Sequence, residues 1–179
     1  MQMNLPNKLT TLRVILIPVF LLVLFLLEEP MNRYIAVAIF IIASLTDFLD
    51  GHLARKYHLV TNFGKFMDPL ADKLLVMSAL VSMVALEDLP AWVVIIILAR
   101  EFAITGFRTL AMEANIVMAA SWWGKIKTTI QMLMIILVLL QLPFAPMDWI
   151  ENIFIGLAVF FTIVSGVDYI VKNRQVLQG

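Results

Sequence analysis

Residues 11–27 read TLRVILIPVFLLVLFLL, an apolar run in which Arg13 is the only charged residue. A helix crosses the hydrocarbon core of a bilayer with roughly 20 apolar residues, within a range of about 17–25. No small-residue cleavage site follows this run, so we expect a membrane span rather than a cleaved signal peptide. The stretch therefore predicts a first transmembrane helix.

Five further apolar stretches follow, each separated from the next by turn or charged residues. They cover residues 34–55, 69–86, 90–112, 122–141 and 150–171. The chain is 62% hydrophobic and 15% charged, with a mean hydropathy of +0.96, whereas soluble domains have about 45–50% apolar and about 25% charged residues. A soluble fold of 179 residues cannot bury so much apolar surface in one core. We therefore predict an all-α integral membrane protein, a single domain over residues 1–179 with six transmembrane helices.

Basic residues gather at both termini and in the second and fourth connections between the predicted spans. They are Lys8, Arg13, Arg55, Lys56, Lys65, Arg108, Lys125, Lys127, Lys172 and Arg174. The other connections are acidic, and Arg33 is their only basic residue. Because cytoplasmic loops are enriched in Lys and Arg, we expect both termini to be cytoplasmic. The formal net charge is zero, so no bulk attraction to nucleic acid is expected.

Four aspartates flank the second connection at helical spacings. Asp47 and Asp50 lie near the end of the second predicted span, and Asp68 and Asp72 lie at the start of the third. Positions three, four and seven apart share one face of a helix. The connection is short, so we expect the two helices to be antiparallel neighbours whose four carboxylates face one another.

Four carboxylates in a small volume repel one another unless cations neutralise them. The chain has no cysteine and no histidine pair at helical spacing, so the site offers oxygen ligands, which suit Mg²⁺ or Mn²⁺ as one ion or two. The small residues Gly51 and Ala54 leave room for a diphosphate, and Arg55 can hold a phosphate. These features favour phosphoryl chemistry.

A plainer interpretation is that the acids only cap helices at the membrane surface. It suits Asp68, at a helix start. It explains Asp47 and Asp50 poorly, because the helix dipole disfavours acids near a helix end.

The stretch as a whole resembles the signature of the CDP-alcohol phosphotransferase family, D-x2-D-G-x2-A-R-x8-G-x3-D-x3-D. Every fixed position is present: Asp47, Asp50, Gly51, Ala54, Arg55, Gly64, Asp68 and Asp72. Residues 7–13, 99–102, 106–108 and 124–128 resemble the bacterial phosphatidylglycerophosphate synthase branch of that family. The resemblance covers essentially the whole chain.

The resemblance implies a function and a site. The function is transfer of the phosphatidyl group from CDP-diacylglycerol to glycerol 3-phosphate, by a homodimer in the bacterial plasma membrane with a site for two divalent ions at the cytoplasmic face. Asp47, Asp50 and Asp68 would be metal ligands, and Asp72 would be both ligand and general base. The residues assigned to CDP-diacylglycerol are Gly51, Ala54, Arg55 and Gly64, with Thr10 and Arg13 at the start of the first helix. For Arg13 the alternative is that it only extends to the membrane interface.

A second group of polar residues is interpreted as a phosphate pocket for the acceptor. Its members are Arg100, Arg108, Lys125, Lys127 and Thr128. The alternative is that the cations only set membrane topology. Arg100 lies midway along its predicted span and needs a partner. Its neighbour Glu101 points elsewhere on a helix, so we expect Arg100 to face the bundle interior, as structure or as part of the pocket.

Two other functions stay open at this point. One is the same chemistry with inositol phosphate, serine or phosphatidylglycerol as the acceptor. The other is a divalent-cation carrier that uses the aspartates as its ion path. Against a carrier, the acids gather at one predicted membrane face.

Overall fold

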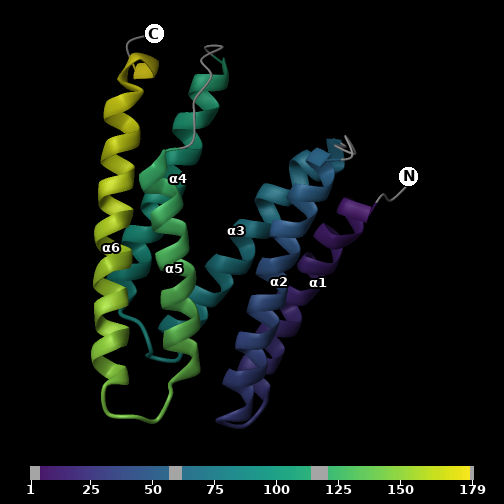
Figure 1. Cartoon of the computed structure of the whole chain (residues 1–179), viewed down its shortest axis with the longest axis vertical. Coiled ribbons are helices and arrows are strands. Elements are labelled where there is room, and N and C mark those ends of the chain that lie inside the picture. Colours follow the sequence, from purple (N-terminus) through teal and green to yellow (C-terminus); the bar gives the residue numbers. More distant parts are fainter. Residues whose placement is uncertain (1–4, 57–61, 114–120, 178–179) are drawn as a thin grey trace. The chain divides into compact units, whose positions relative to one another are not determined.

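Helices account for nearly all of the described chain. The structure is a computed structural model that describes residues 5–56, 62–113 and 121–177. The helices are α1 (Leu5–Leu26), α2 (Met31–Lys56), α3 (Asn62–Ala85), α4 (Ala91–Glu113), α5 (Trp122–Leu140) and α6 (Met147–Lys172), followed by the 3₁₀ helix η1 (Arg174–Leu177) (Figure 1). These residues contain no strand, and the all-α prediction is confirmed.

The helices follow the predicted apolar stretches but extend beyond several of them. α1 begins at Leu5 and α3 at Asn62, ahead of the predicted starts at residues 11 and 69. Hydropathy marks where lipid-compatible residues begin, whereas the i to i−4 hydrogen bonds of a helix continue through polar residues. Pro69 consequently lies inside α3 and not at its start.

Three helices are long and apolar enough to cross a membrane among the residues that are described. They are Asn7–Leu26, Trp122–Leu140 and Met147–Lys172, and the stretch Met31–Thr46 is a shorter apolar helix. The chain therefore has the character of a multi-pass membrane protein. The count of six spans and the cytoplasmic termini stay predictions.

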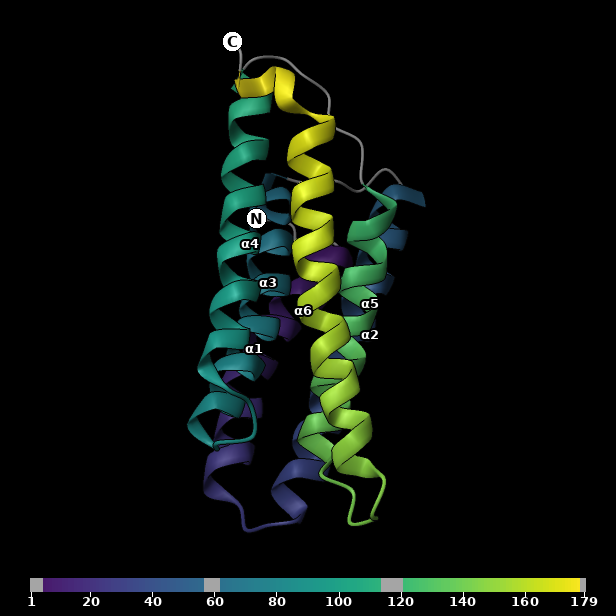
Figure 2. The same ribbon diagram turned by 90° about the vertical axis from the view of Figure 1, so that its left-hand side faces the viewer.

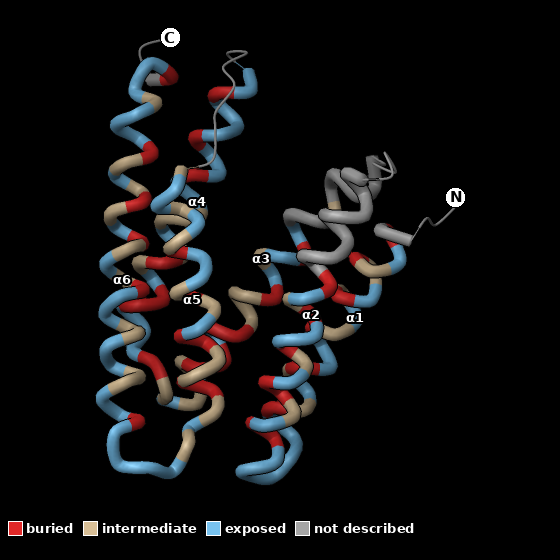
Figure 3. The backbone as a smooth tube through the Cα atoms, in the orientation of Figure 1, coloured by how far each residue is buried: buried red, intermediate tan, exposed pale blue. Residues whose placement is uncertain are grey.

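Large apolar side chains line the outside of these helices. Ile15, Leu22, Ile95 and Phe160 are each more than half exposed, and Figure 3 shows exposed positions along every helix. In water, apolar patches of this extent would drive association. Facing lipid tails, they carry no such penalty, because the tails are as apolar as the side chains.

The chain divides into two compact units. Unit 1 comprises Met1–Ala85 with Leu139–Gln141, and unit 2 comprises Leu86–Val138 with Leu142–Gly179. In unit 1, α1 contacts both α2 and α3, and α2 contacts α3. The rings of Phe20 and Phe40 meet between α1 and α2, with centroids 6.4 Å apart. The single-domain prediction for residues 1–179 is not tested by this division.

One buried face of α1 changes character along its length. Ile17, Phe20 and Leu24 form its apolar part, and the buried Asn7, Thr10 and Arg13 continue the same face toward the N-terminus. All six positions follow the three- and four-residue spacing of a helix face. Unit 1 therefore has an apolar core at one end and a polar interior at the end where α1 begins.

In unit 2, α4 packs against α6, and η1 contacts α4. Trp123 of α5 stacks on Phe161 of α6, with ring centroids 6.0 Å apart. Figures 1 and 2 show that the end of α4, the start of α5 and the end of α6 lie at the same end of this unit. A small buried cluster closes that end, formed by Ile104, Phe107, Ala111, Tyr169 and Val176.

Candidate active site

The four aspartates of the motif belong to the two helices that the sequence predicts. Asp47 and Asp50 lie in the last part of α2, and Asp68 and Asp72 lie in the first part of α3. These helices are in contact within unit 1. Asp72 is exposed on α3. The side chains of Asp47, Asp50 and Asp68 lie outside the described residues, so their approach to one another stays a prediction.

The chemistry of this donor set fits a hard divalent cation. Four carboxylates supply oxygen ligands, which Mg²⁺ and Mn²⁺ prefer, and the chain has no cysteine to favour a softer metal. Helical geometry supports the predicted spacing, because Asp47 and Asp50 share one helix and Asp68 and Asp72 share the next. Among the described side chains there is no group of three or more potential metal ligands. The side chains of Asp47, Asp50 and Asp68 are not among those described.

Other predicted CDP-lipid ligands also fall in this stretch. The side chains of Ala54 and Arg55, and the surroundings of Gly51 and Gly64, lie outside what the structure describes. Gly51, Ala54 and Arg55 belong to α2, and Gly64 belongs to α3.

Thr10 and Arg13 are placed inside unit 1. Both are fully buried, and the Nε of Arg13 donates a hydrogen bond of 3.2 Å to the backbone carbonyl of Ala43 in α2. The interface alternative requires Arg13 to extend to water. Its burial shows that it does not. Ala43 precedes Asp47 by one helical turn, so the buried polar end of α1 adjoins the part of α2 that leads into the motif.

Arg100, Glu101 and Lys127 form an ion cluster that joins α4 to α5. Oε1 of Glu101 lies 2.9 Å from Nη1 of Arg100 and 2.5 Å from Nζ of Lys127. The side chain of Lys127 is 5% exposed, that of Arg100 15% and that of Glu101 22%. The expectation that Glu101 points away from Arg100 is wrong: both side chains are long enough for their ends to meet although their Cβ atoms diverge.

Arg100 is enclosed by helices that carry glycine where they approach it. A Cβ atom at Gly166 of α6 would lie 3.3 Å from Cγ of Arg100, and one at Gly124 of α5 would lie 3.8 Å from its Nη2. The Nε atom of Arg100 is buried and has no hydrogen-bond partner among the described residues. Arg100 therefore faces the interior of its unit, as predicted.

Arg108 is held by α6. Its Nε donates a hydrogen bond of 2.9 Å to the hydroxyl of Tyr169, and its guanidinium carbon lies 5.4 Å from the centre of the Tyr169 ring. Tyr169 is 2% exposed, whereas Arg108 is exposed. A buried tyrosine thus fixes an arginine that remains accessible to a ligand.

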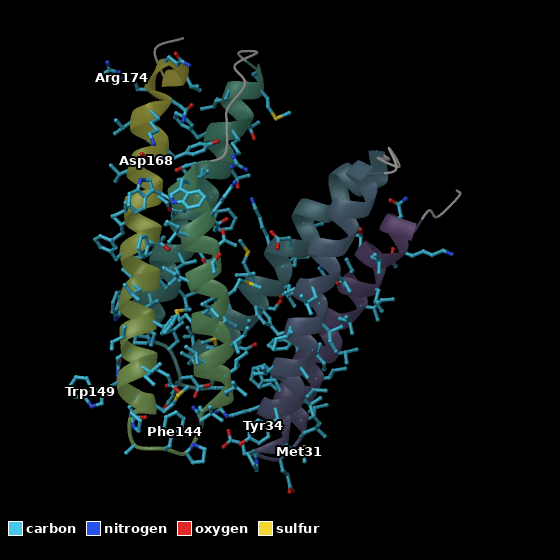
Figure 4. All side chains as sticks on the ribbon, viewed as in Figure 1. Met31, Tyr34, Phe144, Trp149, Asp168 and Arg174 are labelled. Carbon is cyan, nitrogen blue, oxygen red and sulfur yellow. The ribbon has the colours of Figure 1, made fainter. Side chains whose placement is uncertain are left out.

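The remaining acceptor candidates lie at the start of α5. Lys125 is exposed, and its Nζ lies 6.0 Å from the centre of the Trp122 ring. Thr128 is also exposed, and its hydroxyl donates to the carbonyl of Gly124 at 3.0 Å. Nearby, Asp168 of α6 accepts a hydrogen bond of 2.7 Å from Ser121 and pairs with Lys172 at 2.7 Å. Figure 4 shows Asp168 and Arg174 toward the C-terminal end of α6, with Trp149 toward the opposite end.

All five acceptor candidates lie in unit 2, in two different environments. Arg108, Lys125 and Thr128 are exposed. Arg100 and Lys127 share one carboxylate and are mostly buried. Two residues were not anticipated in the site, Glu101 as the shared anion and Tyr169 as the partner of Arg108. The sequence signal for Glu101 is an acid next to Arg100 inside an apolar stretch, whereas Tyr169 has no distinguishing signal in the sequence.

Comparison with known proteins places this chain in a family. Residues 3–164 match the family described as CDP-alcohol phosphatidyltransferase. The CDP-diacylglycerol–glycerol-3-phosphate 3-phosphatidyltransferase of Bacillus subtilis (strain 168) is 45% identical over 98% of this chain and 97% of its own length. Proteins of the same name from Rickettsia bellii (strain RML369-C) and Shigella flexneri serotype 5b (strain 8401) are 38% and 41% identical, covering 93% and 90% of this chain and 93% and 87% of their own lengths. The chain belongs to the CDP-alcohol phosphatidyltransferase family.

Proposed function

We propose that the protein transfers the phosphatidyl group of CDP-diacylglycerol to glycerol 3-phosphate, giving phosphatidylglycerophosphate and CMP for phospholipid synthesis. The observation that carries this proposal is the complete eight-residue motif on two contacting helices. The full-length similarity to relatives named for this reaction supports the same acceptor. A membrane enzyme suits the substrate, because the acyl chains stay in the bilayer while the head group reaches the interface.

The motif residues divide into ligands for a metal and ligands for the nucleotide lipid. Two divalent ions, Mg²⁺ or Mn²⁺, would be held by Asp47, Asp50, Asp68 and Asp72. When bound, the ions neutralise negative charge on the diphosphate. CDP-diacylglycerol would be held by a set of residues around that site, Thr10, Arg13, Gly51, Ala54, Arg55 and Gly64.

The reaction is a displacement at the β-phosphorus of CDP-diacylglycerol. Asp72 accepts the proton of the acceptor hydroxyl. The acceptor oxygen forms a bond to the β-phosphorus, and the bond from that phosphorus to CMP breaks. Arg55 offers a fixed positive charge to the phosphates.

The acceptor phosphate is bound in unit 2. Arg108 and Lys125 are the exposed cations that contact it, with the Thr128 hydroxyl beside them. Arg100 and Lys127 contribute through the ion cluster with Glu101, whose two cations and one anion leave a net positive charge. This charge favours an anionic acceptor over a neutral or zwitterionic one.

The membrane arrangement is proposed from the positive-inside pattern. It has six spans, both termini in the cytoplasm and the active site at the cytoplasmic face of the bacterial plasma membrane. The protein forms a homodimer and a single domain over residues 1–179.

The decisive experiment measures CMP release from CDP-diacylglycerol by purified protein with Mg²⁺ or Mn²⁺. Glycerol 3-phosphate, inositol phosphate, serine and phosphatidylglycerol are offered separately. We expect release with glycerol 3-phosphate alone and its loss on adding EDTA. Release with another acceptor would retain the reaction and replace the acceptor. No release from folded protein, together with divalent-ion flux in liposomes free of CDP-lipid, would instead indicate the carrier.

Replacing Arg108 with Gln tests the acceptor pocket. The change should raise the KM for glycerol 3-phosphate by about tenfold or more, because a charge-assisted contact to phosphate is lost. The KM for CDP-diacylglycerol should stay within about twofold, since that substrate is bound elsewhere. Initial rates at varied concentrations of each substrate measure both constants. An equal rise in both would place Arg108 outside an acceptor-specific pocket.

A further inference from the structure

Tyr169 is a buried residue whose hydroxyl contacts Arg108. Its ring lies in the buried cluster with Ile104, Phe107 and Ala111, and its edge-to-face contact with Phe107 has a centroid distance of 6.3 Å. The backbone carbonyl of Tyr169 accepts a hydrogen bond of 2.7 Å from the side chain of Asn173. Ring and backbone are therefore both fixed, so the hydroxyl occupies a defined place at the margin of the cluster.

Arg108 meets this hydroxyl through one particular nitrogen. A guanidinium carries five N–H groups in a rigid fork, one on Nε and two on each terminal nitrogen. The Nε group donates to Tyr169 at 2.9 Å, and the Tyr169 ring lies 5.4 Å from the guanidinium carbon. With Nε occupied, the two terminal nitrogens remain for a planar, bidentate contact with a phosphate. Within the described residues, neither of them is engaged in a hydrogen bond or ion pair.

We propose that Tyr169 is a positioning residue for the acceptor: it orients Arg108 so that its two terminal nitrogens bind the phosphate of glycerol 3-phosphate. The inference rests on the proposed function and adds to it a residue that acts through Arg108 without touching the substrate. It means that the planar geometry of the Arg108 guanidinium, and not only its charge, recognises the acceptor. A free arginine side chain loses much rotamer entropy when it binds a ligand, and an arginine already held at Nε loses less.

The alternative is that the hydrogen bond between Arg108 and Tyr169 only stabilises the fold. In that case its removal would alter stability without selecting between the two substrates. A positioning role instead predicts a defect that is confined to the acceptor and that depends on Arg108. The two roles therefore differ in a measurable way.

The test is Tyr169→Phe, which removes the hydroxyl and retains the ring and its packing. We expect the KM for glycerol 3-phosphate to rise about fivefold, because one charge-assisted hydrogen bond that fixes Arg108 is lost. The KM for CDP-diacylglycerol and kcat should change less than about twofold. The matched control is Tyr34→Phe, at a 40% exposed tyrosine of α2 in unit 1, which should leave all three constants unchanged.

A double variant shows whether Tyr169 acts through Arg108. Adding Tyr169→Phe to Arg108→Gln should cause no further rise in the KM for glycerol 3-phosphate, because the residue being positioned is already absent. A further fivefold rise would show that the hydroxyl acts by another route and would overturn the proposal. An unchanged KM in folded Tyr169→Phe would also overturn it.

Arg108→Lys keeps the test independent of the folding of Tyr169→Phe. Lysine retains the charge but lacks both Nε and the fork, so we expect the KM for glycerol 3-phosphate to rise nearly as much as in Arg108→Gln. A KM equal to that of the wild type would mean that charge alone suffices, and the proposed orientation would be wrong. If the wild type releases no CMP with glycerol 3-phosphate, the proposed function fails first. If the wild type is active and both Tyr169→Phe and Arg108→Lys have its KM for glycerol 3-phosphate, only the proposed role of Tyr169 is wrong.

Discussion

Asp72→Asn is expected to lower the rate of CMP release by about 10²–10⁴-fold. Asparagine has nearly the shape of aspartate but cannot accept the proton of the acceptor hydroxyl. It also removes one negative charge from the proposed metal ligands, which weakens the binding of a divalent cation. Asp72 is exposed on α3, so its replacement should leave the packing of unit 1 intact.

The measurement is the initial rate with saturating CDP-diacylglycerol, glycerol 3-phosphate and Mg²⁺ or Mn²⁺. Retained helical circular dichroism and a single peak in size-exclusion chromatography would show that the variant is folded. Asp148→Asn is the matched control, because Asp148 is an exposed aspartate at the start of α6 and outside the proposed site. Near-normal turnover by folded Asp72→Asn would remove Asp72 from the role of general base.

The sequence predicts the helices well because lipid imposes a simple rule. A spanning segment has to satisfy its own backbone hydrogen bonds and remain apolar over about 20 residues, so the apolar stretches locate the helices. The rule says less about where a helix ends, as the early start of α3 at Asn62 shows. Polar residues such as those before Pro69 continue a helix without contributing to the hydropathy signal.

The composition of the candidate site is local information, and the sequence contains it. Asp47 and Asp50 stand one turn apart, as do Asp68 and Asp72, and these pairs are joined by a short connection. The contact of Arg108 with Tyr169 is different, because the two residues are 61 positions apart. They meet because α4 packs on α6. No spacing pattern in the sequence predicts that these two residues are in contact.

The pairing of Arg100 was mispredicted for a different reason. Cβ directions alone separate neighbouring residues on a helix, but the ends of long side chains can still converge. Glu101 pairs with both Arg100 and Lys127, because a mostly buried cation without an anion would be strongly destabilising. The burial of Lys127, 26 positions from Glu101, could not be read from the sequence.

Glu101→Gln is expected to destabilise the protein by about 3–5 kcal/mol, the cost typical of breaking a buried ion pair by removing one partner. Glutamine retains the size of glutamate but not its charge, so the ion pairs that Glu101 makes with the mostly buried Arg100 and Lys127 are both lost. The thermal midpoint of purified protein in detergent, followed by intrinsic fluorescence, measures the change. Glu113→Gln is the matched control on the same helix, since Glu113 is exposed, and its effect should stay within about 0.5 kcal/mol.

Lys127→Met separates the structural role of the cluster from its proposed role in binding the acceptor. Methionine fits a site where the lysine side chain is 5% exposed, and its introduction leaves Glu101 paired with Arg100 at 2.9 Å. Charge therefore remains balanced, and we expect a much smaller loss of stability than in Glu101→Gln. If Lys127 also attracts the acceptor phosphate, the KM for glycerol 3-phosphate rises in this stable variant; an unchanged KM would confine Lys127 to joining α4 and α5. Equal destabilisation by the two variants would contradict this explanation, because only Glu101→Gln removes the carboxylate that both cations share.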